Sequence, residues 1–86
     1  MTLQITEKDT VFYLKGSLNT ITSNSFNEYF ESLLEQFKKV VINIDNIAAI
    51  DKIGVATFKN LFYAYKQQKK QLLIIGNGCK DLYDAF

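Results

Sequence analysis

The sequence predicts a single α/β domain over residues 1–86, with helices mainly on one face of a mixed, mostly parallel four-stranded sheet. Short aliphatic or β-branched runs alternate along the chain with stretches whose apolar residues recur every three or four positions, as in a helix. Two polar residues separate the first two strand-like runs, and this spacing indicates an N-terminal hairpin. With 86 residues, 48% of them hydrophobic, the chain can form one packed core and has no room for a second.

The first two strands form the predicted hairpin. Leu3–Glu7 alternates apolar and polar residues, as a half-buried strand does, and Thr10–Lys15 supplies the second strand. We expect Lys8 and Asp9 to make the turn between them, although the Asn-Gly pair typical of such turns is absent. Gly16 is expected to end the second strand.

A polar cluster precedes the first predicted helix. Thr22 alone can serve as the N-cap, or Ser25 can do so in a capping box with Glu28. Lys38 and Lys39 are expected to close the helix, where its dipole favours cations. The apolar stripe predicted to face the sheet consists of Phe26, Phe30, Leu33, Leu34 and Phe37.

The second half of the chain predicts two short buried strands around a second helix. Val40–Ile44, which is apolar except at Asn43, and Leu72–Ile75 are the two strand-like runs, and the helix extends from about Ile53 to Lys69. A short terminal helix over Lys80–Phe86 brings the expected number of helices to two or three. Strand–helix–strand units of this kind imply parallel pairing through right-handed crossovers. The apolar stripe of the second helix comprises Val55, Phe58, Leu61, Phe62 and Tyr65.

The composition argues against several classes of function. The chain has no histidine, which removes the commonest general base and transition-metal ligand, and all its positive charges are lysines. A net charge of +1 argues against a nucleic-acid or membrane-surface binder. The single cysteine, Cys79, excludes an internal disulfide, and the lack of a signal peptide or long apolar run favours the cytoplasm without direct membrane insertion. We therefore expect a non-enzyme with no cofactor and no metal.

The segment 40–58 leads from a buried strand through an acidic turn into the second helix. Asp51 is expected to cap that helix. Lys52 opposes the helix dipole, so it is either an incidental solvated residue or a contact for an acidic group on a partner. Ile53 either packs into the core or points outward as an apolar anchor, and we favour the second. Thr57 is expected to serve packing or the surface, with a displaced phosphorylation site as the less favoured alternative.

Three segments resemble the STAS domain, the family of bacterial anti-sigma factor antagonists. Residues 16–19 followed by Thr22 resemble the family's Gly-x-Leu-Asp-x-x-Thr opening of the first helix. The strand at 40–44 followed by residues 50–54 resembles its strand and Asp-Ser-Ser-Gly segment, and residues 72–77 resemble its last central strand and the following turn. The resemblance covers nearly the whole chain and implies a STAS-like sandwich that acts as a protein-binding regulatory module.

The resemblance also implies that a phosphorylation switch is missing. In the family, a kinase that is also an anti-sigma factor phosphorylates the second serine of Asp-Ser-Ser-Gly, and the added charge ends the complex. The equivalent position here is Ile53, and the family's acidic residue after Gly-x-Leu is the neutral Asn19. The implied partner is an anti-sigma factor and serine kinase or, alternatively, the ATPase of an ABC lipid-transport system that carries this chain as an accessory subunit. Self-association stays open. The expected partner-binding residues are Asn19, Thr20, Asp51, Lys52, Ile53, Gly54 and Thr57.

Overall fold

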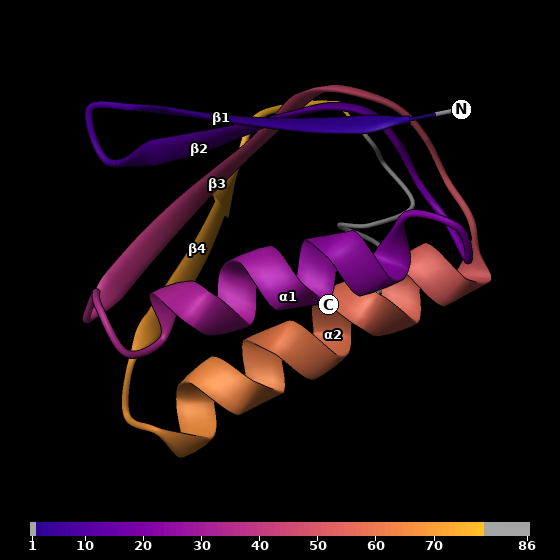
Figure 1. Ribbon diagram of the computed structural model, residues 1–86. Helices are drawn as coiled ribbons and strands as arrows, with labels where there is room; N and C mark the ends of the chain where they lie inside the picture. The colour runs from indigo at the N-terminus through magenta and orange to yellow at the C-terminus, as the bar shows by residue number, and fades with distance from the viewer. Residues whose placement is uncertain (1, 79–86) are drawn as a thin grey trace.

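A computed structural model describes residues 2–78 and confirms the predicted mixed, mostly parallel four-stranded sheet (Figure 1). The elements follow in the order β1 (Leu3–Lys8), β2 (Val11–Leu18), α1 (Ser23–Leu33), β3 (Lys39–Ile50), α2 (Lys52–Gln67) and β4 (Gln71–Ile75). The strands lie in the spatial order β1-β2-β3-β4; β1 is antiparallel to β2, and the other neighbours are parallel. Both helices lie side by side on one face of the sheet (Figure 1). The predicted helix at 80–86 and Cys79 fall outside the described residues.

The core fills the space between the sheet and the two helices. Phe26 contacts both Phe30 and Phe58, with ring centroids 4.8 and 4.9 Å apart. Tyr65 donates a hydrogen bond from its buried hydroxyl to the carbonyl oxygen of Phe30 at 2.7 Å, and burial raises the pKa of Tyr65 to about 12. The sheet contributes the fully buried aliphatic residues Leu14, Leu18, Val40, Ile42 and Ile44. Neither helix within residues 2–78 is long and apolar enough to cross a membrane.

The hairpin turn lies one residue later than predicted. Lys8 still belongs to β1 and pairs with Val11, so Asp9 and Thr10 form the two-residue loop. Their φ angles are 53° and 66°, and two central residues with positive φ are the mark of a type I′ turn. The prediction was wrong because Asp9 and Thr10 stand in place of the Asn-Gly pair that normally indicates a type I′ turn in a sequence.

The prediction that Gly16 ends β2 was also wrong. β2 continues to Leu18, with register shifts against β3 on both sides of Lys15-Gly16. Gly16 has a φ of 118°, and an added Cβ would lie 2.1 Å from the backbone oxygen of Thr2. The next residue, Ser17, donates its N–H to that same oxygen at 3.0 Å. Gly16 thus allows β1 to remain paired with β2 at the point where β2 changes its register against β3.

The bounds of α1 differ from the prediction at both ends. The helix starts at Ser23 with Thr22 in the N-cap position, so Ser25 lies inside the first turn and forms no capping box. The helix ends at Leu33, and the lysines at 38 and 39 therefore do not close it. Lys39 instead begins β3.

Two strands depart from the predicted short, buried runs. β3 continues beyond Ile44 to Ile50, so only Asp51 separates it from α2. β4 is the last strand of the sheet within residues 2–78, and Leu72 is its one buried residue: Ile74 is partly buried, and Leu73 and Ile75 are 42% and 43% exposed. The apolar stripe of α2 is likewise wrong at Phe62, which is 39% exposed.

Candidate functional site

The carboxyl ends of β2 and β3 meet at the N-terminus of α2. Leu18 is the register partner of Ile50, and the N–H of Asp51 donates to the carbonyl oxygen of Leu18 at 3.3 Å. The connection from β2 to α1 and the start of α2 therefore lie at the same end of the sheet, where β2 and β3 finish (Figure 1). We call this region the α2-start surface; it comprises Asn19, Thr20, Ile21, Asp51, Lys52 and Ile53.

Asp51 caps α2, as predicted. Its backbone is extended, with φ −101° and ψ −175°, and its Oδ1 accepts a hydrogen bond from the N–H of Gly54 at 2.8 Å. This bond satisfies one of the N–H groups that a helix start leaves without an intrahelical partner. Lys52 is the first residue of the helix and is exposed, which places a cation beside the positive end of the helix dipole.

Gly54 allows α2 to begin directly against β2. A Cβ built on this residue would lie 2.3 Å from the carbonyl oxygen of Leu18 and 2.7 Å from Cγ1 of Ile50. Both distances are shorter than a carbon atom tolerates. The predicted site residue Gly54 is therefore buried, and its role in the α2-start surface is to let the neighbouring residues approach the end of β2.

The side chain of Asn19 organises the connection between β2 and α1. Its Oδ1 accepts hydrogen bonds from the N–H groups of Ile21 and Thr22 at 2.9 and 3.2 Å. Thr22 accepts from the Asn19 N–H at 3.0 Å and donates to the carbonyl oxygen of Ser17 at 2.9 Å. The loop is held by these bonds, and its tip, Thr20 and Ile21, is exposed.

Thr57, the remaining predicted site residue, does not reach this surface. It is 6% exposed, and its hydroxyl donates to the carbonyl oxygen of Ile53 at 2.8 Å. The hydroxyl oxygen of Thr57 also lies 3.1 Å from Oγ of Ser23 at the start of α1. Thr57 therefore joins the first turns of the two helices and presents no hydroxyl to a partner.

Two large apolar side chains are exposed at the α2-start surface. Ile53 is 50% exposed, in agreement with the expectation that it points outward. Ile21 is 80% exposed, and the predicted site omitted it although it included the neighbouring Asn19 and Thr20. The available signal was a bulky apolar residue between Thr20 and Thr22. Beside Ile53, a shallow hollow of about 470 Å³ is lined by Ile50, Asp51, Lys52 and Val55.

The side chains of the α2-start surface are of kinds that form protein–protein contacts. It combines exposed isoleucines with one carboxylate, one ammonium group and the polar groups of a loop. Within residues 2–78, no three histidine, cysteine, aspartate or glutamate side chains come close enough to hold a metal ion. The exposed isoleucines can form the apolar core of an interface, and the charged and polar groups around them can form its rim.

The family model of the STAS domain matches residues 1–81 of this chain. The chain belongs to the STAS domain family. In this STAS domain, residues 51–54 at the start of α2 read Asp-Lys-Ile-Gly. No curated protein matches the chain in sequence.

Solved structures share the fold of this STAS domain at low sequence identity. The anti-sigma factor antagonist SpoIIAA in its unphosphorylated form superposes with a TM-score of 0.74 and 11% identity, over 98% of this chain and 80% of that chain. The Bacillus cell fate determinant SpoIIAA in the phosphorylated form gives 0.73 and 12%, over 98% and 79%. A crystal structure of Mglu gives 0.70 and 12%, over 86% of this chain but only 19% of that chain.

Proposed function

We propose that this STAS domain is a non-enzymatic, protein-binding regulatory module that binds its partner through the α2-start surface without a phosphorylation switch at position 53. The observation that carries the proposal is the half-exposed Ile53 in the first turn of α2. By its resemblance to the family's Asp-Ser-Ser-Gly segment, this position corresponds to the serine that is phosphorylated in the family. Isoleucine has no hydroxyl to modify, but it is a good apolar anchor for an interface.

The exposed apolar area can contribute free energy to binding of a partner. Full burial of an isoleucine side chain contributes about 1.5–3 kcal/mol. Because Ile21 is 80% and Ile53 is 50% exposed, a partner that covered both would gain roughly 2–4 kcal/mol from them. Lys52 is exposed and precedes Ile53 in the chain, and it favours a partner with an acidic group beside its apolar pocket.

The partner that we propose is an anti-sigma factor with serine kinase activity. SpoIIAA, which shares the fold, is an anti-sigma factor antagonist and has been solved in unphosphorylated and phosphorylated forms. With Ile53 in place of a serine, control would pass from phosphorylation to the abundance of the chain or the state of its partner. The second candidate is an accessory subunit on the ATPase of an ABC lipid-transport system, and the missing hydroxyl favours it because that use requires binding alone.

Affinity capture with the tagged chain, followed by identification of the bound protein, separates these candidates. Recovery of a GHKL-type kinase supports the first, and recovery of an ATPase with Walker motifs supports the second. Ile53→Asp should weaken capture of the partner at least tenfold, because it places a charge in the apolar contact. Tyr63→Asp, at a 61% exposed position further along α2, is the matched control and should bind normally. Undiminished binding by Ile53→Asp would exclude the α2-start surface as the interface.

Phosphate transfer tests the missing switch directly. Incubation of the chain with the captured kinase and ATP should leave position 53 unmodified, whereas Ile53→Ser should become phosphorylated and then release the kinase. Phosphorylation of the wild-type chain within the first turns of α2 would contradict the proposal. The buried Thr57 hydroxyl makes that outcome unfavourable.

A further inference from the structure

The outer edge of β4 carries backbone groups that can pair with another strand. Within residues 2–78, β4 is the last strand of the sheet, and the N–H of Gln71 points inward to the carbonyl oxygen of Lys38 at 2.9 Å. Backbone groups of successive residues in a strand point to opposite edges. The N–H and C=O groups of Leu72 and Ile74 therefore point outward, where an added strand would find them.

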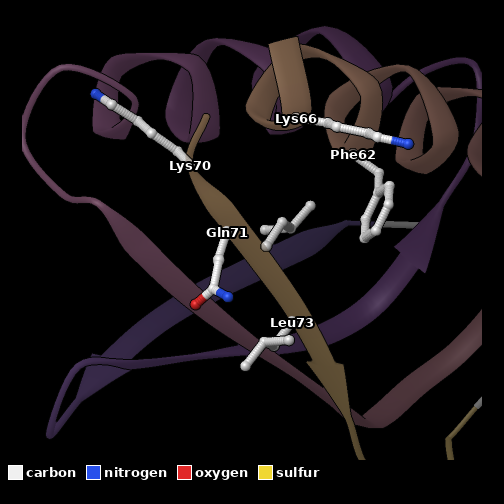
Figure 2. A pocket seen from close by; sticks show the side chains of 6 residues that line it. Phe62, Lys66, Lys70, Gln71 and Leu73 are labelled. Atoms are coloured by element: carbon white, nitrogen blue, oxygen red, sulfur yellow. The ribbon is translucent and has the colours of Figure 1, made fainter. Parts of the chain in front are cut away.

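A groove of about 300 Å³ lies between this edge and the second half of α2. Figure 2 shows Phe62 and Lys66 on the α2 side of the groove, whereas Gln71 and Leu73 point to the other side of β4. The groove is basic: among residues 2–78, its lining includes two lysines and no acidic residue. The lining residues are Phe62, Lys66, Lys70, Gln71, Leu72 and Leu73.

Apolar side chains are accessible on both sides of the β4 edge. On the α2 side, Phe62 is 39% exposed. On the face of the sheet away from the helices, Leu73 and Ile75 are 42% and 43% exposed. Because side chains of a strand alternate between the two faces, one extended segment beside β4 would contact both groups at once.

We propose that the β4 edge is a second docking surface, which binds an extended acidic peptide segment of a protein partner as a fifth strand. The backbone groups of Leu72 and Ile74 would supply the pairing, and the exposed apolar residues would hold alternate side chains of the peptide. Carboxylates of the peptide would lie near Lys66 and Lys70. A second copy of this chain fits less well, because it brings the same two lysines and no compensating acid from this groove.

This docking surface is independent of the α2-start surface. Lys52 and Lys66 are separated by about 20 Å along α2, given a rise of about 1.5 Å per residue. A partner can therefore occupy both surfaces, or two partners can occupy one each. Substitutions at the groove should leave capture through Ile53 unchanged, so the two proposals can fail separately.

A peptide-binding assay with the full chain tests the proposal. The probe is a fluorescently labelled peptide of about eight residues that alternates glutamate and valine, measured by fluorescence polarisation. It should bind with an affinity that falls as salt is raised. The same peptide with glutamine in place of glutamate should bind roughly tenfold more weakly, and one with a central proline should lose binding because it cannot complete the pairing. Equal binding of all three peptides, or no saturable binding of the first, would overturn the proposal.

Charge reversal locates the contact on the protein. Lys66→Glu combined with Lys70→Glu should weaken binding of the acidic peptide roughly tenfold or more. Lys59→Glu, an exposed α2 position that does not line the groove, is the matched control and should bind normally. On peptide binding, amide hydrogen exchange at Leu72 and Ile74 should slow. Unchanged exchange there, or sedimentation showing that copies of the chain pair and exclude the peptide, would rule out the acidic strand.

Discussion

Gly54 brings the first turn of α2 against the end of β2, so Gly54→Ala tests whether this close approach is real. The added Cβ would lie 2.3 Å from the Leu18 carbonyl oxygen and 2.7 Å from Cγ1 of Ile50. The Ile50 side chain can rotate away. The Leu18 oxygen cannot, because it belongs to the backbone of β2 and accepts a hydrogen bond from the Asp51 N–H at 3.3 Å. The clash is therefore relieved only if α2 moves outward.

Three effects, one stabilising and two destabilising, set the change in the free energy of unfolding. Alanine is better than glycine inside a helix by roughly 0.5–1 kcal/mol. Forcing an extra methyl group into a packed position costs about 1–3 kcal/mol. An outward shift of α2 also stretches the bond of 2.8 Å between Asp51 Oδ1 and the Gly54 N–H, and a helix cap is worth about 1 kcal/mol. We expect Gly54→Ala to lower the free energy of unfolding by about 2 kcal/mol.

Urea unfolding followed by far-ultraviolet circular dichroism measures this change. Ala56→Gly is the matched control: this exposed position on the same helix reports the helix-propensity effect alone, a loss of about 1 kcal/mol. If Gly54→Ala proved as stable as the wild type, or more stable, the helix would not be held against β2 in the way described. Its affinity for the partner should fall as well, because α2 carries Ile53.

Substitutions at two further positions, Asp51 and Tyr65, report on how α2 is held. Asp51→Ala should lose about 1 kcal/mol of unfolding free energy, whereas Asp51→Asn keeps an acceptor for the Gly54 N–H and should lose only a few tenths; equal losses in urea unfolding would refute the cap. Tyr65 has its pKa raised from 10.0 to about 12 by burial, so the folded state favours the protonated phenol. Its contribution is complete below pH 10 and is lost as the pH rises from about 10 to 12, a loss of roughly 2–3 kcal/mol. Tyr65→Phe should lack this component of the alkaline loss, and an identical pH dependence in both proteins would contradict it.

Local patterns were sufficient for the elements whose partners are close in sequence. The apolar spacing of α2 and the Asp51 cap depend on residues within one or two turns; the cap was predicted, and so was the apolar stripe except at Phe62. The turn at Asp9 and Thr10 was missed because the β-branched Thr10 stands at a positive-φ position where glycine is usual, so the sequence did not indicate a type I′ turn there. The edge position of β4 was missed because a run of aliphatic residues is similar in a central strand and in an apolar edge strand. Sheet order decides between the two.

The parts of the candidate site that depend on the start of α2 alone were predictable. The parts whose burial or exposure depends on residues elsewhere in the chain were missed. Thr57 is buried because it meets Ser23, which lies 34 residues earlier in the chain. Ile21 is exposed because the side chain of Asn19 accepts from the N–H groups of residues 21 and 22 and so holds the loop with its tip outward. Neither contact has a signature in the spacing of apolar residues.

An isoleucine at position 53 affects the unbound chain as well as its proposed regulation. A serine at a helix start is readily solvated, whereas Ile53 leaves apolar surface in water whenever the partner is absent. That exposure raises the free energy of the unbound state and so favours association with a partner that covers Ile53. Lys52 beside it keeps a charge at the same surface, which opposes non-specific association and admits partners with an acidic neighbour. On the proposed function, Lys52 and Ile53 therefore suit a selective and persistent contact, from which the chain is released by a change in its partner.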